Sequence, residues 1–215
     1  MVEVVTPRLE IRGLGKAFGG TLALSGVDLA IGPGEVHALL GENGAGKSTL
    51  TKIVSGVLRA DAGTLALDGQ PFSPRSPAEA RRAGVALVHQ DPALCPHLSV
   101  AANVMLGREP ARFGWVDRPR LRDEARRALE WVAPEFSPDA AMSELGPADV
   151  QLVTLARALA HANCRLLILD EPTSSLAAPE VERLFAVVRR LAESGVAVLY
   201  ISHFLEEVLR IADRY

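Results

Sequence analysis

The sequence lacks the features that mark membrane-spanning, disulfide-bonded or nucleic-acid-binding chains. Its only cysteines, Cys95 and Cys164, have no CxxC spacing, and its formal net charge at pH 7 is only −3. No apolar run approaches the roughly 20 residues that span a bilayer, and the N-terminus has no basic segment followed by an apolar one. We therefore expect a cytosolic protein with reduced thiols, a structural disulfide being the less favoured alternative, and no general attraction to nucleic acid or a membrane surface. Any membrane role must come through a partner.

The chain has enough apolar material for one substantial core. Of its 215 residues, 48% are hydrophobic, which suits one domain with a subdomain and is too little for two full domains of ordinary size. Neither an internal repeat nor a low-complexity tract interrupts it.

The stretch GENGAGKST at residues 41–49 satisfies the phosphate-binding pattern G-x-x-x-x-G-K-[ST], a P-loop. Its glycines permit the positive φ angles and close backbone approach that let several N–H groups converge on one phosphate chain. A helix is expected to begin at the end of the loop, so that its positive dipole end also faces the phosphates. Lys47 adds a charge over the β- and γ-phosphates, Ser48 offers a hydroxyl to Mg²⁺, and Thr49 caps or coordinates beside it. The nucleotide-binding residues predicted in the loop are Gly41, Glu42, Asn43, Gly44, Ala45, Gly46, Lys47, Ser48 and Thr49.

The sequence around the loop predicts an α/β fold and argues against a chance match of the motif. A short apolar run at residues 35–40 enters the loop, and apolar residues at helical spacing follow it. Continuous apolar runs at residues 165–169 and 196–201 are typical of strands buried on both faces of a parallel sheet. A helix over residues 179–193 separates them, and residues 84–90 predict a further core strand.

Two other regions differ from this parallel core. Residues 9–31 and 63–69 predict short strands joined by glycine-containing turns, which together form a small β layer. The segment from about residue 91 to residue 160 is predominantly helical, with one apolar helix face between residues 118 and 132 and many charges on the solvated side.

Polar residues at strand ends are the candidates for chemistry, since ligands bind at the carboxyl ends of parallel strands. Asp170 and Glu171 end the strand at residues 165–169. Asp170 would hold the Mg²⁺ shell and Glu171 would polarise an attacking water, although an acidic pair can also simply precede a helix. Gln90 closes its strand with an amide that suits both the Mg²⁺ shell and the water. His203 follows the strand at residues 196–201, where an imidazole can bind a γ-phosphate and sense its loss.

Two more residues have competing interpretations. Phe18 can stack on an adenine ring, but an isolated phenylalanine is more often part of a core. His37 lies inside a predicted strand and is interpreted as a packing residue.

In the order of its motifs the chain resembles ABC-type ATPases over nearly all of its length. It presents residues similar to their A-loop, Walker A, Q-loop, helical subdomain, Walker B, D-loop and H-loop, in that order: Phe18, GENGAGKST, Gln90, the helical segment, LLILDEP, Ser174-Ser175-Leu176 and YISH. Within that superfamily, three stretches look like the first nucleotide-binding half of the ATPase subunit of bacterial ribose, galactose and xylose-type importers: EVHALLGENGAGKSTL, HQDPALCPHLSVAANVMLGREP and ISHFLEEVLRIADRY.

The resemblance implies a P-loop NTPase of the ABC type with a RecA-like parallel-sheet core, a small antiparallel β layer and a helical subdomain. Residues 1–215 would be one nucleotide-binding domain, with residues 1–90 and 161–215 as β layer and core and residues 91–160 as the helical subdomain. Lys47, Glu171 and His203 would be catalytic. Phe18, the P-loop and Gln90 would bind ATP, and Mg²⁺ would be held by Ser48, Gln90 and Asp170.

The resemblance also implies a setting. ATP hydrolysis would drive sugar uptake through separate transmembrane permease subunits and, indirectly, a sugar-binding protein, with no nucleic acid involved. The chain would be soluble and would sit peripherally on the cytoplasmic side of the bacterial inner membrane. Its partner would be a second nucleotide-binding domain, since family members continue past the position of Tyr215 into another strand and a second half.

One motif departs from the family pattern. Where relatives carry an LSGGQ-like signature loop, which grips the γ-phosphate held by the opposite domain, this chain reads Leu145-Gly146-Pro147-Ala148-Asp149. Gly146 lacks the serine hydroxyl, Pro147 lacks an N–H, and Ala148 restricts the backbone where glycine allows close approach. Gly-Pro remains a good plain helix start. Ala177 also stands where many relatives carry a D-loop aspartate.

Three functional hypotheses follow. In the first, Lys47, Asp170 and Glu171 catalyse hydrolysis when another domain supplies an intact signature. In the second, the isolated chain is an ATP-binding module with weak hydrolysis, because two copies would face each other with degraded loops. The third is an ABC ATPase outside transport, as in translation factors and chromosome machines, and it is less favoured because those depend on intact signatures. A P-loop kinase is less favoured still, because it would not require Gln90, Glu171 and His203 in this order.

Overall fold

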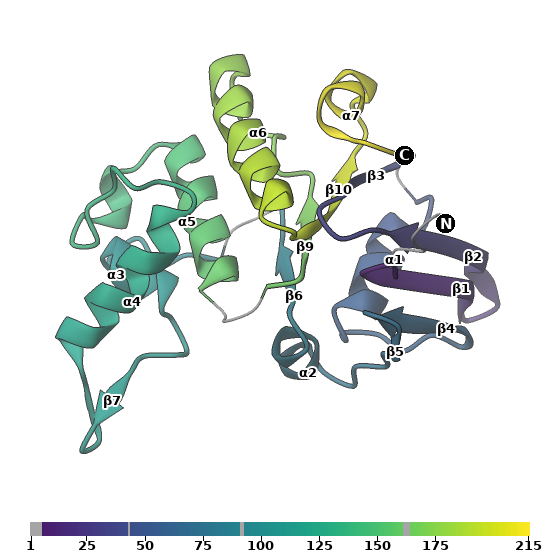
Figure 1. The fold of residues 1–215 in the computed structure, drawn as a ribbon, viewed down its shortest axis with the longest axis horizontal. Coiled ribbons are helices and arrows are strands. Elements are labelled where there is room, and N and C mark those ends of the chain that lie inside the picture. Colours follow the sequence, from purple (N-terminus) through teal and green to yellow (C-terminus); the bar gives the residue numbers. More distant parts are fainter. Residues whose placement is uncertain (1–5, 43, 91–92, 161–163) are drawn as a thin grey trace, which may run out of the picture. The chain divides into compact units, whose positions relative to one another are not determined.

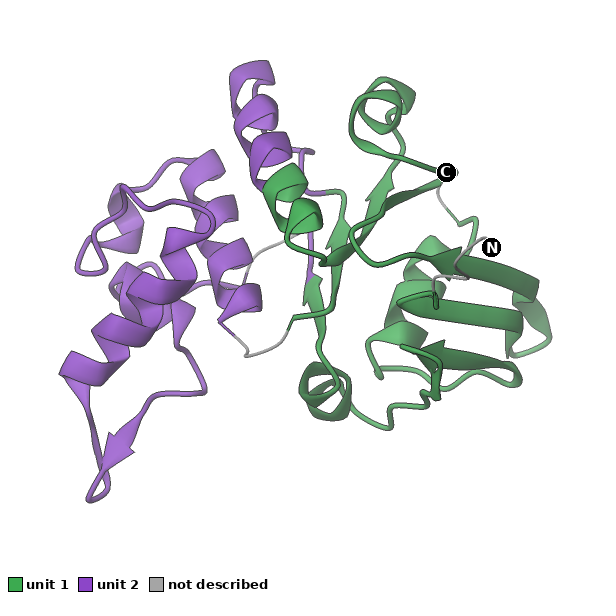
Figure 2. Ribbon diagram, in the orientation of Figure 1, with its two compact units in different colours: residues 1–87, 164–171, 188–215 green, residues 88–163, 172–187 purple. Residues whose placement is uncertain are grey.

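The computed structural model describes residues 6–42, 44–90, 93–160 and 164–215 of the chain. It divides into two compact units, residues 1–87, 164–171 and 188–215 in the first and residues 88–163 and 172–187 in the second (Figure 2). This grouping differs from the predicted subdomains mainly at residues 172–187, which join the second unit instead of the ATPase core. None of the helices among these described residues is long and apolar enough to cross a bilayer.

The first unit contains the predicted antiparallel layer. Its strands are β1 (Leu9–Phe18), β2 (Thr21–Ile31), β4 (Ala62–Leu67) and β5 (Gln70–Pro71), in the order β2-β1-β4-β5 (Figure 1). The segment before the P-loop thus forms two strands of 10 and 11 residues, longer than the short strands expected.

The second sheet is the parallel core, with strand order β3-β10-β9-β6. It comprises β3 (Val36–Leu40), β6 (Val85–Val88), β9 (Leu166–Asp170) and β10 (Ala197–Ser202). Strand β10 pairs in parallel with both β3 and β9, and every residue of β10 is buried. The prediction of strands buried on both faces is therefore confirmed.

Helices of the first unit cover these sheets. Helix α1 (Lys47–Val54) buries Leu50, Ile53 and Val54 in a core cluster with β1, β9 and β10, as the helical spacing predicted. Val57 lies beyond the helix and is 52% exposed. The unit also includes α2 (Pro77–Arg82) and α7 (Leu205–Ile211), which contacts β10 and β3. Helix α6 (Ala178–Glu193) runs across the division between the units.

The second unit is mainly helical. Helices α3 (Val100–Val104), α4 (Arg118–Glu130) and α5 (Pro147–Leu159) contact one another, and a 3₁₀ turn, η1 (Met142–Glu144), precedes α5. The apolar face predicted for residues 118–132 is confirmed by the buried side chains of α4, namely Leu121, Ala125, Ala128 and Leu129.

A small hairpin in this unit escaped prediction. Strands β7 (Ala111–Arg112) and β8 (Trp115–Val116) pair around Phe113 and Gly114, whose φ angles are 53° and 83°. Such a turn normally carries asparagine or aspartate before glycine. The sequence signal was absent because Phe113, which is 90% exposed, occupies that position.

Both cysteines are free, as their spacing suggested. Burial raises the pKa of the Cys164 thiol to about 12. The reactive thiolate form of Cys164 is therefore scarce at neutral pH.

A buried amide shapes the segment that leads into α3. Asn103, which is fully buried, accepts the Cys95 N–H at 2.7 Å and donates to the carbonyls of Cys95 and Ser99, each at 3.0 Å. Residues 95–99 thereby satisfy backbone groups that have no regular secondary structure to pair with.

We expect Asn103→Ala to lower the free energy of unfolding by about 2–3 kcal/mol, because buried backbone groups lose their partner. Urea denaturation measures this. Thr154→Ala is the matched control, since the Thr154 hydroxyl only donates to the Val150 carbonyl within α5, and it should cost less than about 1 kcal/mol. Equal losses in the two variants would contradict this role of Asn103.

Candidate functional site

The register of the parallel sheet brings the predicted motifs of the first unit to one edge. Ser202 on β10 lies opposite Leu40, the last residue of β3, and Ile201 lies opposite Asp170, the last residue of β9. The P-loop, Glu171 and His203 each follow directly after these positions. Three segments that are distant in sequence therefore leave the sheet at the same level.

The Lys47 side chain folds back onto the backbone of the P-loop. The Lys47 ammonium donates to the carbonyl oxygens of Gly41 at 2.6 Å and Glu42 at 3.0 Å. The N–H groups of Thr49 and Leu50 both donate to the Gly46 carbonyl, and these bonds begin the hydrogen-bond ladder of α1. Ala45 donates to the Glu42 carbonyl at 3.2 Å. Asn43, also predicted to bind nucleotide, lies outside the described residues.

Two glycines give the loop its shape. Gly44 and Gly46 have φ angles of 86° and 93°, in the left-handed region that favours glycine. At Gly46 an added Cβ would also meet the Ala23 carbonyl oxygen of β2 at 2.5 Å, whereas at Gly44 no heavy atom of the described neighbours lies within 4 Å. Only Gly46 therefore combines the conformation with close packing against a neighbouring strand.

The acidic pair and the histidine meet at the ends of β9 and β10. The Glu171 carboxylate lies 3.2 Å from His203 Nδ1, and the Glu171 N–H donates to the Ile201 carbonyl at 3.0 Å. Glu171 has a φ of 46°, an unusual conformation for a residue with a side chain and before a proline. The chain thus turns out of the sheet at Glu171, and its half-buried carboxylate faces the imidazole.

The other residues singled out in the sequence, Phe18, Gln90 and His37, lie on different elements. Phe18 at the end of β1 is 46% exposed, so the interpretation as a core residue is excluded, and the Lys16 ammonium lies 5.5 Å from its ring centroid. Gln90 is exposed two residues beyond β6, within the second unit. The roles of both in nucleotide binding stay predictions. His37 is buried and bonds Glu35 at 2.9 Å, which confirms its interpretation as a packing residue.

The described part of the chain gathers few metal ligands in one place. Among the described residues, no group of three or more His, Cys, Asp or Glu side chains is placed to hold an ion. A Mg²⁺ ion usually keeps several waters and takes only one or two protein ligands together with substrate phosphates. Ser48, exposed in the first turn of α1, and Asp170, half-buried at the end of β9, fit that sparse requirement.

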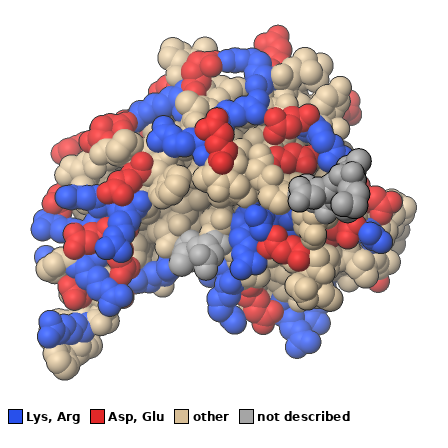
Figure 3. All heavy atoms as spheres, viewed as in Figure 1, with Lys and Arg blue, Asp and Glu red and all other residues tan. Residues whose placement is uncertain are grey.

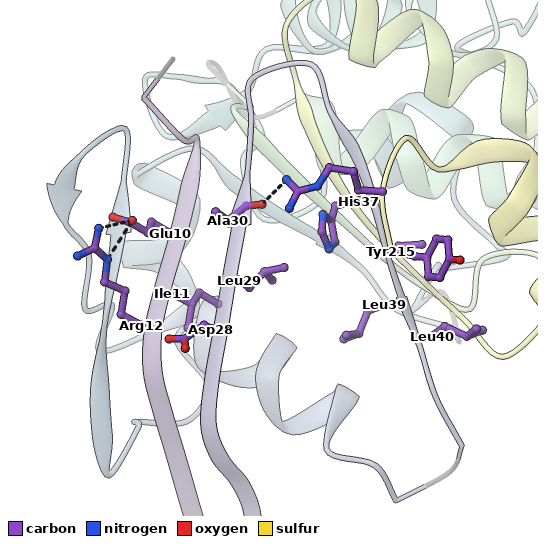
Figure 4. Close-up of a pocket in the computed structure, with 12 residues that line it drawn as sticks. Glu10, Ile11, Arg12, Asp28, Leu29, Ala30, His37, Leu39, Leu40 and Tyr215 are labelled. Atoms are coloured by element: carbon purple, nitrogen blue, oxygen red, sulfur yellow. Dashed lines mark hydrogen bonds and ion pairs between the residues drawn. The ribbon is translucent and has the colours of Figure 1, made fainter. Parts of the chain in front are cut away.

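A separate groove in the first unit does not belong to this site. It measures about 900 Å³ and lies between β1 and β2 on one side and β3 on the other, with Arg214 and Tyr215 at its margin (Figure 4). Of the predicted site residues that the structure describes, none lines it. Across the face in Figure 3, acidic and basic side chains are interspersed and do not gather into one basic surface.

The start of α5, where the signature loop was sought, already carries a negative charge. Pro147 occupies the first helical turn, and the N-cap residue Gly146 provides no side-chain hydrogen bond. Asp149 lies in the same turn, and its carboxylate bonds Arg183 Nη1 at 2.8 Å. Arg183 in turn pairs with Glu135. Because a carboxylate already complements the positive end of the helix, this terminus is poorly suited to a second anion.

One residue beside the site was missed by sequence reasoning. Glu207 on α7 accepts hydrogen bonds from Tyr200 and Ser202, which lie within the last three residues of β10. Two hydroxyls two residues apart in an otherwise apolar strand were the available signal, since buried hydroxyls require a partner.

Known proteins are similar to this chain in sequence and in fold. The family model described as ABC transporter matches residues 24–174. The ribose import ATP-binding protein RbsA 1 of Rubrobacter xylanophilus is 52% identical over 97% of this chain, and the chain covers 42% of that protein. A ribose import ATP-binding protein RbsA of Chromobacterium violaceum is 49% identical over 96% of the chain and is covered over 41% of its length.

Solved structures have the same fold as this chain. A crystal structure of a nucleotide-free ATP-binding cassette from an ABC transporter matches with a TM-score of 0.86 and 27% identity, covering 97% of this chain and 87% of that one. The fold predicted from the motifs is thereby confirmed. The chain spans less than half the length of the curated relatives named above.

The two glycines of the loop give a matched test. Gly44→Ala is expected to lower the free energy of unfolding by about 1–2 kcal/mol, the cost of a left-handed backbone for alanine. Gly46→Ala is expected to cost about 3 kcal/mol or more, because the clash with the Ala23 carbonyl adds to that strain. Urea denaturation of the two variants separates the effects, and indistinguishable losses would show that the packing of Gly46 is unimportant.

Proposed function

The chain belongs to the ABC transporter family, and from that membership we propose that it binds Mg·ATP and hydrolyses it to drive sugar import. The observation that carries the proposal is the shared level at which the P-loop, Glu171 and His203 leave the parallel sheet. The two relatives named above are ribose import proteins, which supports a sugar as the transported substrate.

Binding would rest on the P-loop. The Lys47 ammonium has three hydrogens, of which the carbonyls of Gly41 and Glu42 take two, so one donor remains for a phosphate oxygen. The N–H groups at the start of α1 add donors and the positive dipole end. Ser48 and Asp170 would hold Mg²⁺, which when bound neutralises charge on the β- and γ-phosphate oxygens. Phe18 would stack on the adenine, and Gln90 would bind the nucleotide and its Mg²⁺.

Hydrolysis would rest on Glu171 and His203. The Glu171 carboxylate would accept a hydrogen bond from the attacking water and orient it toward the γ-phosphate. His203 Nδ1 lies 3.2 Å from that carboxylate, so the imidazole would fix the carboxylate on one side. Its other ring nitrogen would remain available to the γ-phosphate.

The site would be completed by other chains or domains. The named relatives are more than twice as long as the matched region, which supports a second nucleotide-binding domain as the direct partner. We infer that separate permease subunits supply the membrane-spanning part and that a sugar-binding protein delivers the substrate. The domain would then lie peripherally on the cytoplasmic side of the inner membrane.

Glu171→Gln, placed in the longer ATPase and assembled with its permease, is expected to reduce the ATP hydrolysis rate by about 100-fold or more while ATP still binds, because the amide is a poorer acceptor for the proton of the attacking water. Steady-state phosphate release and nucleotide binding measure the two effects. Glu193→Gln, at an exposed position of α6, is the control and should change neither. An unchanged hydrolysis rate in Glu171→Gln would refute the catalytic assignment.

A second candidate function is favoured by the start of α5. Because Pro147 removes an N–H and Asp149 already places a carboxylate in the first turn, this domain would serve a partner's ATP site badly. Two copies of the isolated chain would share that defect. The isolated chain would then be an ATP-binding module with weak hydrolysis of its own.

Restoring the loop tests this second candidate. In the triple variant Gly146→Ser, Pro147→Gly, Ala148→Gly, we expect turnover by the isolated chain to rise by about 10-fold or more, since a hydroxyl, an N–H and backbone freedom return to the helix start. ATP binding should stay unchanged, and circular dichroism reports whether α5 persists. A folded, ATP-binding triple variant with no gain in turnover would exclude the loop as the cause of weak hydrolysis.

A further inference from the structure

Buried hydroxyl groups lie directly before the turn that carries His203, near the end of β10. Tyr200 and Ser202 lie two residues apart on β10, so their side chains point to the same face of the sheet. They are 0% and 1% exposed. Helix α7 packs against β10 and β3 and begins two residues after His203.

Both hydroxyls converge on one carboxylate oxygen of α7. Tyr200 Oη donates to Glu207 Oε2 at 2.9 Å, and Ser202 Oγ donates to the same oxygen at 3.1 Å. The Ser202 hydroxyl also accepts the Phe204 N–H at 3.0 Å. Ser202 is thus tied both to the helix and to the residue on the far side of His203.

These contacts fix the backbone on both sides of His203 while leaving its side chain open. The imidazole is 43% exposed, so burial alone does not orient it. What the structure provides is the constrained turn, the Glu171 carboxylate at 3.2 Å, and the Phe204 ring with its centroid 4.0 Å away. A change in the turn would move the imidazole relative to Glu171.

We propose that Glu207 is a positioning residue that holds the His203 turn in register with Glu171. A carboxylate suits this place because it only accepts hydrogen bonds, and both hydroxyls must donate to be satisfied. An amide oxygen in the same place could still accept from both hydroxyls, but it lacks the negative charge that strengthens the two bonds, and its NH₂ group can only donate. The inference rests on the proposed function, in which His203 takes part in ATP hydrolysis.

A double-mutant cycle in the longer, permease-assembled ATPase distinguishes positioning from a general structural role. Glu207→Gln is expected to lower kcat by about 10- to 100-fold and to leave KM for ATP within about twofold, since a small misplacement near the chemistry is enough. In a His203→Ala background the same substitution should change kcat by less than about twofold, because the residue through which it acts is absent. Glu206→Gln, one position earlier on α7 and exposed, is the control and should have no effect in either background.

Tyr200→Phe provides a second variant if Glu207→Gln proves too unstable to assay. It removes one hydroxyl from a side chain that stays the same shape, and it should reproduce a smaller kcat loss with the same dependence on His203. An equal loss of kcat from Glu207→Gln with and without His203 would overturn the inference.

A spectroscopic measurement separates the failure of this inference from the failure of the proposed function. The imidazole resonance of His203, assigned through His203→Ala, should shift in Glu207→Gln and stay in place in Glu206→Gln. If it shifts while His203→Ala leaves kcat unchanged, His203 is positioned by Glu207 but takes no part in hydrolysis, and the proposed function fails at that point. If it does not shift, Glu207 does not position His203.

Discussion

Strand β10 pairs in parallel with β3 on one side and with β9 on the other, and the proposed site depends on that register. Because all three strands run the same way, the segments that follow them leave the sheet together. Ser202 lies opposite Leu40, and Ile201 lies opposite Asp170. A shift of one residue would turn each side chain to the opposite face and would separate His203 from Glu171. Burial of the whole of β10 makes such a shift costly, which is why the site can rely on residues at strand ends.

Much of this architecture could be predicted because local sequence and tertiary structure agree. The apolar runs that form β9 and β10, the helical spacing after the P-loop and the motif itself are signals within a few residues of one another. The contact between Glu171 and His203 was not predicted, since it joins two segments through the sheet register and has no local sequence signal. Glu207 was missed because its role depends on two hydroxyls that carry no motif.

Other features were missed where local preference and structure disagree. The hairpin formed by β7 and β8 places Phe113 in a left-handed conformation that phenylalanine rarely adopts. The turn residues therefore did not predict the hairpin. Residues 172–187 follow the Walker B strand in sequence, and the prediction assigned them to the core. In the structure these residues belong to the second compact unit.

We propose that the domain builds an ATP site of its own but does not supply a working signature loop to a partner. The P-loop, Asp170 and Glu171 would form the ATP site, and the start of α5, with Pro147 and Asp149, would lack the donors that the signature loop requires. The most direct measurement is the ATP turnover of the isolated chain as a function of its concentration, with bound Mg·ATP determined in the same samples. We expect saturable binding of one nucleotide per chain and a low turnover per chain that does not rise with concentration. A robust turnover that climbs as chains associate would contradict it.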